Sequence, residues 1–271
     1  MELTEFLGLV QLMFPPSVAM QGDPIGLHVD SVRSTANRVL VAMELTDDVL
    51  DEAVQDASDT IVVFHPLVYR PLSMIHRGDR TGRLVANLIR HDIALVVVHT
   101  SFDSYPHGTN ALLAQRLGLH HHRPLVPDQR DGFGMGLLVQ LPSPIPFAEL
   151  IERVHSTCGS PVRYCPAPTD QVERIAIVGG SGMSFYPAAI DAQADVLITA
   201  DIRYHDFHAA TGRIGLIDPG HYEMEQFVAE GIVAALRPHV PASVTLSCST
   251  VVTNPVHYNV RPLPTDSYSH H

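Results

Sequence analysis

Short runs of β-branched and other apolar residues recur along the chain. Several of these runs are continuously apolar and do not alternate with polar residues, which is typical of strands covered on both faces. We therefore predict seven strands, within residues 39–45, 60–65, 93–100, 136–141, 174–180, 195–201 and 213–218.

Amphipathic patterns typical of helices separate the strands. One such segment begins with Thr46, an N-cap residue type, and has acids in its first turn. Two further segments begin at Thr81 and Thr109, and the second ends at Gly118, a residue type that favours the left-handed conformation after a helix. Strands that alternate with helices predict an α/β fold.

The composition changes between residues 120 and 134, where proline, histidine and glycine accumulate. This stretch is typical of a connector, and a new strand-to-helix unit begins after it at residues 145–159. We therefore expect two lobes. The first takes residues 1–125 and 215–271, and the second takes residues 126–214.

The overall composition narrows the class of protein. Of the 271 residues, 45% are hydrophobic and 17% are charged, which predicts a folded globular chain. The formal net charge is −12 and no basic run is present, which argues against nucleic acid as a partner, since phosphate contacts supply most of that affinity. The scattered cysteines Cys158, Cys165 and Cys248 suggest a reducing compartment. No run of about 18 apolar residues and no signal peptide is recognisable, so we expect a soluble cytoplasmic protein without a membrane span.

Residue types that can bind metals stand at four predicted strand ends, where open α/β sheets place their ligand crevices. These residues are His65; His99 and Asp103; Asp201, His205, Asp206 and His208; and Asp218, His221 and Glu225. Imidazoles and carboxylates that converge in this way predict a divalent metal site, for zinc, manganese or iron.

The most informative pair is His221 and Glu225. If a helix begins near His221, the two side chains lie one turn apart on the same face, beside an apolar stripe formed by Met224, Val228 and Ile232. An imidazole and a carboxylate in this arrangement can bind one cation together.

Each of these residues also has a purely structural interpretation. His65 could be a packed histidine before a proline, Asp103 could cap a turn, and Glu225 could be an ordinary acid near a helix start. The three histidines at 120–122 are typical of a solvated loop. The glycine-rich segment 178–182 lacks the full spacing of a nucleotide-binding loop and a following lysine, so a tight turn explains it equally well.

Several motifs in succession resemble one family, that of the GTP cyclohydrolase 1 type 2 homologues, also called Nif-three-like proteins. The matching stretches are residues 24–29, 39–54, 65–72, 99–103, 108–119, 178–185 and 194–227. The resemblance implies a two-lobed α/β subunit with mixed sheets flanked by helices. It also implies a homo-oligomer, a ring-shaped hexamer, with a dinuclear metal centre in each subunit.

The resemblance also implies a ligand set. One metal ion would take His65, Asp103 and Glu225, and the other would take the residue at position 64, His221 and the bridging Glu225. Here the chain departs from the family, because Phe64 stands where a histidine is usual and offers no lone pair. The second site would then be empty, weak, or rebuilt by His99, His205 or a water, so we expect one or two ions per subunit.

Two functions remain open at this point. The first is a divalent-metal-dependent hydrolase that acts on a nucleotide or phosphoester-type small molecule, with His99 or His205 transferring protons. The second is a non-catalytic scaffold, either for metal binding and delivery or for regulation.

Overall fold

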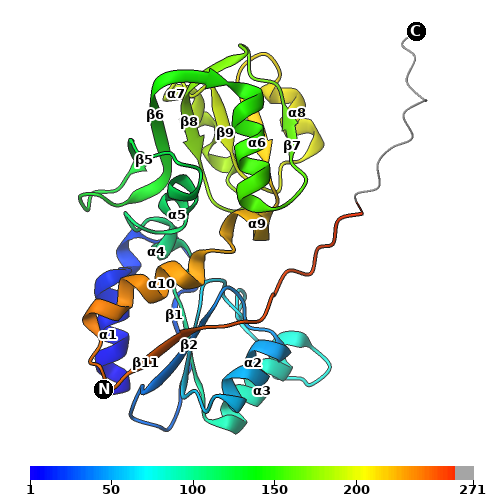
Figure 1. Ribbon diagram of the computed structural model, residues 1–271. Coiled ribbons are helices and arrows are strands. Elements are labelled where there is room, and N and C mark those ends of the chain that lie inside the picture. Colours follow the sequence, from blue (N-terminus) through cyan, green and yellow to red (C-terminus); the bar gives the residue numbers. More distant parts are fainter. Residues whose placement is uncertain (260–271) are drawn as a thin grey trace.

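Two sheets, one in each half of the molecule, organise the computed structural model, which describes residues 1–259 (Figure 1). The first sheet has the order β1 (Gly26–Val29), β4 (Ala94–Val97), β3 (Thr60–Val63), β2 (Arg38–Ala42) and β11 (Thr245–Cys248). Strand β1 is antiparallel to its neighbour, and the other four strands are parallel.

Helices cover both faces of this sheet. Helices α2 (Asp47–Gln55) and α3 (Arg80–His91) pack on one face, and α1 (Leu3–Met13) and α10 (Val228–Leu236) pack on the other. Burial on both faces explains why the central strands are continuously apolar: every residue of β3 and β4 is buried.

The second sheet has the order β5 (His122–Pro127), β6 (Gly134–Pro146), β8 (Gln171–Ile177), β9 (Val196–Ile198), β10 (Gly215–Asp218) and β7 (Arg163–Cys165). Strands β8, β9 and β10 are parallel, and the remaining pairs are antiparallel. Helices α5 (Thr109–Arg116) and α6 (Phe147–Cys158) cover one face, and α7 (Tyr186–Asp191) and α8 (Tyr204–Ala210) cover the other. Both sheets are mixed and flanked by helices, as the α/β prediction required.

All seven predicted strands are present, but the predicted connector is partly wrong. Residues 122–127 form β5, which pairs with β6 along the edge of the second sheet. The expected lobe boundaries at residues 126 and 214 do not coincide with the division between the two sheets. Strands β5 and β10 both lie in the second sheet, and α5 packs against it. The predicted boundaries cut through β5 and assign β10 and α5 to the first lobe. The lobes as independent units stay a prediction.

The helix signals were right for two of the three segments. The Thr46 side chain accepts a hydrogen bond from the backbone N–H of Val49 at the start of α2, and Gly118 has a φ of 72° after α5. Helix α3 begins one residue earlier than predicted, at Arg80, and the Asp79 side chain caps it by accepting a hydrogen bond from the backbone N–H of Gly82. Among residues 1–259, none of the helices combines the length and the apolar composition that a membrane span requires.

The parallel register brings the polar strand ends of the first sheet together. Strands β2, β3 and β4 run side by side, so their carboxyl ends meet at one edge. The ladder continues beyond the strands: the backbone N–H of His65 donates to Met43, and that of His99 donates to Phe64. Glu44, His65 and His99 therefore leave the sheet at the same place.

Candidate metal centre

Three side chains converge between the two sheets. His65 follows β3, while His221 and Glu225 are the first and last residues of the short helix α9 (His221–Glu225). The Nε2 atoms of His65 and His221 lie 3.3 and 3.0 Å from the same carboxylate oxygen, Oε2 of Glu225. One donor atom of each residue lies within 4.8 Å of the others. Ligands of one tetrahedral zinc ion lie about 3.3 Å apart, so this spacing suits a single ion.

Helix α9 differs from the single long helix that the apolar stripe predicted. The helix ends at Glu225, and the next helix, α10, begins only at Val228. Met224 packs in the core of the second sheet, whereas Val228 and Ile232 pack in the core of the first. The break therefore anchors the pair His221 and Glu225 between the two cores.

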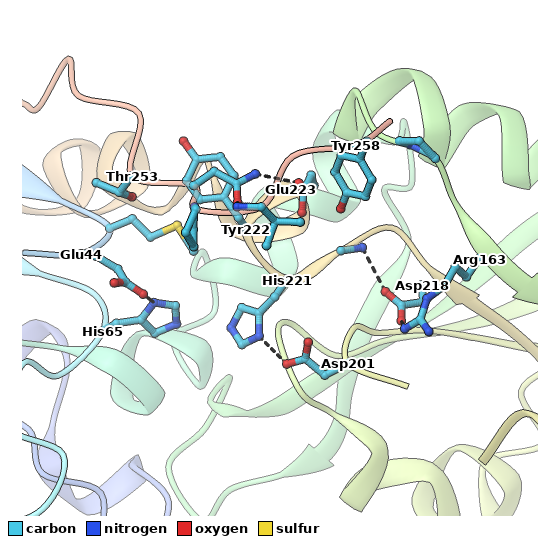
Figure 2. A pocket seen from close by; sticks show the side chains of 16 residues that line it. Glu44, His65, Arg163, Asp201, Asp218, His221, Tyr222, Glu223, Thr253 and Tyr258 are labelled. Atoms are coloured by element: carbon cyan, nitrogen blue, oxygen red, sulfur yellow. Dashed lines mark hydrogen bonds and ion pairs between the residues drawn. The ribbon is translucent and has the colours of Figure 1, made fainter. Parts of the chain in front are cut away.

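A carboxylate stands behind each imidazole (Figure 2). Oε1 of Glu44 lies 3.2 Å from Nδ1 of His65, and Oδ2 of Asp201 is hydrogen-bonded to Nδ1 of His221 at 2.7 Å. Each Nδ1 atom thus faces an acid while each Nε2 atom faces Glu225. Metal-binding histidines are commonly oriented by such a carboxylate, which fixes the ring and its tautomer.

The charges at this site depend strongly on one another. Burial lowers the pKa of His65, but the carboxylates of Glu225 and Glu44 outweigh it and raise that pKa to about 10. Burial likewise opposes protonation of His221, whose pKa Glu225 and Asp201 raise to about 9. Burial would raise the pKa of Glu225, but the two histidines lower it to about 2. Without a metal, the carboxylate of Glu225 therefore favours the protonated form of both imidazoles.

Unpaired buried atoms test whether a metal fits. Among residues 1–259, Oδ1 of Asp103 is buried without a hydrogen-bond partner, and Oε2 of Glu225 makes no well-aligned hydrogen bond although two Nε2 atoms lie 3.3 and 3.0 Å away. Buried polar groups normally have partners, and those that lack one are often ligands of a bound ion. Burial and the charge of Glu225 raise the pKa of Asp103 to about 7, as expected for an acid that lacks a cation. Two imidazoles and a buried carboxylate, with a second carboxylate nearby, fit a divalent metal ion.

The glycine-rich loop 178–182 packs directly against the donors. A β-carbon on Gly180 would lie 2.6 Å from Oε1 of Glu225 and 3.0 Å from Nε2 of His221. Gly180 also has a φ of 57°, which side chains rarely adopt. The loop therefore forms one wall of the metal centre, and glycine is required there for space as well as for conformation.

The other predicted site residues lie at different distances from this centre. Asp103 ends α4 (His99–Asp103) and lines, together with His99, a cavity of about 230 Å³ that His65, His221 and Glu225 also line. Asp103 is not a member of the compact three-donor group. The structure does not bring His205 to the centre: it lies exposed on α8 and packs against the ring of Tyr204.

Position 64 is part of the core of the first sheet. The Phe64 side chain is fully buried, and its ring centroid lies 4.8 Å from that of His65 and 5.6 Å from that of His99. His99 in turn is held by Asp23, whose Oδ1 lies 2.7 Å from Nδ1 of His99. An apolar ring thus stands beside the centre where the resemblance implies a second metal's ligand.

The sequence interpretation missed Glu44 and Asp23 as partners of histidines. Glu44 could have been found, because it stands two residues beyond β2 and the neighbouring parallel strand carries His65. Asp23 gave no such signal, since it lies in a turn 76 residues before His99.

The chain is similar to known proteins in both sequence and structure. The family Duf34/NIF3 (NGG1p interacting factor 3) matches residues 1–255, which is nearly the whole chain. The chain belongs to the Duf34/NIF3 family. It is 32% identical over 234 residues to a GTP cyclohydrolase 1 type 2 homolog from Lactococcus lactis, covering 84% of this chain and 89% of that protein. A Streptomyces coelicolor protein of the same name is 33% identical over 232 residues, covering 82% and 81%.

A solved NIF3-related structure also shows the fold. The crystal structure of a Bacillus cereus protein related to NIF3 superposes with a TM-score of 0.87 and covers 96% of this chain and 99% of its own. At 23% identity, that likeness establishes the NIF3 fold alone. The resemblance drawn from the sequence motifs is confirmed.

Proposed function

We propose that this NIF3 protein is a divalent-metal-dependent hydrolase of a small molecule and works with one metal ion per subunit. The observation that carries the proposal is the convergence of two imidazole nitrogens on one buried carboxylate oxygen at 3.3 and 3.0 Å. A divalent ion held by His65, His221 and Glu225, with Asp103 as a further donor, would lower the pKa of a water and polarise the bond under attack.

The remaining side chains position the donors and handle protons. Glu44 and Asp201 hold His65 and His221 by Nδ1 and leave each Nε2 free for the centre. His99 borders the same cavity, and its Nδ1 is taken by Asp23, so Nε2 is the atom available to accept or donate a proton. His205 is the weaker candidate for this role because of its exposed position on α8.

The substrate is expected to be a nucleotide or another small molecule with a hydrolysable ester or C–N bond. The name of the relatives from Lactococcus and Streptomyces points to GTP, which carries bonds of both kinds. A cavity of about 530 Å³ next to His65 and His221 has a volume typical of small-molecule sites.

The experiment is turnover by protein loaded with zinc, manganese or iron, compared with two variants. We expect His65→Ala to lose both metal and activity. We expect His99→Gln to keep its metal, which elemental analysis would show, and to lose about a hundredfold in kcat. If loaded protein hydrolyses neither nucleotides nor phosphoesters nor amidines, the hydrolase proposal falls.

One observation favours a second candidate, a metal-delivery scaffold. Phe64 removes a donor from the centre and therefore favours a more readily released ion. Exchange of bound zinc against a chelator within seconds, without any turnover, would support delivery instead of catalysis.

We also propose that the chain forms a homo-oligomer, with the ring-shaped hexamer as the expected form. The support for this is the family resemblance. Light scattering on the purified protein would give the mass, and a monomer at micromolar concentration would contradict the assembly.

A further inference from the structure

The chain beyond β11 continues without helix or strand and lies along one side of the larger cavity (Figure 2). Within the described part of the chain, none of residues 250–259 shares a backbone-to-backbone hydrogen bond with another residue. Side chains therefore hold this segment in place, and their contacts show which parts of the molecule it joins.

The start of the segment is fixed to the first sheet and its helices. The Glu52 carboxylate of α2 accepts hydrogen bonds from the backbone N–H of Thr250 at 2.8 Å and from the Thr250 hydroxyl at 2.6 Å. Val251 packs against the core that α2 and α3 form with this sheet. This end of the segment is therefore bound to the same sheet as His65, which follows β3.

The far end of the segment is fixed to the beginning of α9, beside a metal donor. Asn254 Nδ2 donates to the buried Glu223 carboxylate at 2.8 Å, and loss of this bond would leave the carboxylate without that donor. The Tyr258 hydroxyl lies 2.7 Å from the position of a β-carbon on Gly220. Burial and the charge of Glu223 raise the pKa of Tyr258 to about 12, so its hydroxyl keeps its proton. The segment thus contacts residues that precede and follow His221.

Helix α9 needs such support at its first residue. The helix has five residues, and no described side chain caps its N-terminus, so it is not stable alone. Asp201 and Gly180, which contact the ring of His221, both follow strands of the second sheet. Helix α10 packs on the first sheet, but it begins only at Val228. His221 is therefore held from the second sheet, whereas His65 belongs to the first.

We propose that residues 250–258 form a clasp that joins the first sheet to the start of α9 and keeps His221 at the distance from His65 that one metal ion requires. Asn254 and Tyr258 are then positioning residues, since they support the helix that carries a donor and do not touch the ion. The inference rests on the metal centre of the proposed function and is independent of any turnover.

Asn254→Asp tests the clasp, because it keeps the shape of the side chain and places a second carboxylate against Glu223. We expect zinc to bind about tenfold more weakly, and to pass to a chromophoric chelator about tenfold faster. In the double variant Glu223→Gln, Asn254→Asp the amide and the carboxylate exchange places. The hydrogen bond then returns, and both values should return to within about threefold of those of the unaltered protein.

Asn87→Asp is the matched control. It makes the same chemical change on α3, where Asn87 accepts a hydrogen bond from Arg90 at 2.7 Å, and should leave zinc binding unchanged. Unchanged zinc affinity and release in Asn254→Asp would overturn the inference, and so would an equal loss in Asn87→Asp. A loss in Asn254→Asp that the exchanged pair does not restore would overturn it as well, since the added charge would then be the cause.

Hydrogen exchange of the metal-free protein separates the clasp from the proposed function. The clasp predicts that a peptide spanning α9 exchanges about tenfold faster in Asn254→Asp than in the unaltered chain, and equal exchange contradicts it. A protein that binds no zinc would defeat the proposed metal centre, and this comparison would then decide on the clasp. Zinc affinity that depends on the clasp, without any turnover, would support the clasp and defeat the hydrolase.

Discussion

Nε2 of His221 lies 3.0 Å from Oε2 of Glu225, one helical turn further along α9. A helix of only five residues holds this pair, and it is anchored in two different hydrophobic cores. The contact is therefore set by packing on both sides and not by helix propensity, since a helix this short is not stable alone. Four consequences can be measured.

Replacing Glu225 by glutamine should abolish tight metal binding. The substitution keeps the shape of the side chain but removes the charge that both imidazoles face, so we expect zinc affinity to fall by about a hundredfold or more. Competition with a chromophoric chelator measures the change. A Glu225→Gln protein that binds zinc as well as the unaltered chain would contradict the ligand assignment.

The metal-free protein should lose stability as pH rises above about 6.5. The folded-state pKa values of His65 and His221, about 10 and about 9, lie above the unfolded value of about 6.5. Their contribution to the free energy of unfolding is therefore complete below pH 6.5 and is lost as pH rises through 9 and 10. Thermal unfolding in a chelator between pH 6 and pH 10 checks this.

The His65→Ala, His221→Ala double variant provides the control for this pH dependence. It should show a flatter profile over the same range, because both titrating groups are gone. An equally steep decline in the double variant would assign the pH effect to other residues.

A side chain at Gly180 should damage the metal centre. In Gly180→Ala the new β-carbon would lie 2.6 Å from Glu225 and 3.0 Å from His221, so the donors must move apart. We expect zinc affinity to fall at least tenfold. Gly212→Ala is the matched control, since Gly212 has a similar φ of 73° but nothing within 4 Å of the position of a β-carbon. Equal losses in both variants would mean that backbone conformation alone matters.

Restoring a histidine at position 64 should raise the metal content. Phe64 is buried beside His65 and His99, so an imidazole there would add a donor at the edge of the centre. We expect the metal content of Phe64→His, measured by elemental analysis, to rise from about one ion per subunit to about two. An unchanged count would mean that position 64 does not limit the second site.

The strands and part of the metal centre could be predicted from the sequence. The contacts that could not be predicted depend on residues far apart in the chain. The strands and the pair His221 and Glu225 follow from local periodicity, which a single chain displays directly. The pairings of His65 with Glu44 and of His99 with Asp23 depend on sheet register and on a distant turn, which local patterns do not contain. The break between α9 and α10 was also missed, because an apolar stripe does not show that Met224 and Val228 face different cores.

Diffraction from zinc-soaked crystals, with data collected at the zinc absorption edge, would locate the metal ion itself. We predict one strong anomalous peak per subunit about 2.0–2.2 Å from Nε2 of His65, Nε2 of His221 and a carboxylate oxygen of Glu225. Zinc found only elsewhere, for example at the exposed histidines 120–122, or no ordered zinc at all, would contradict it.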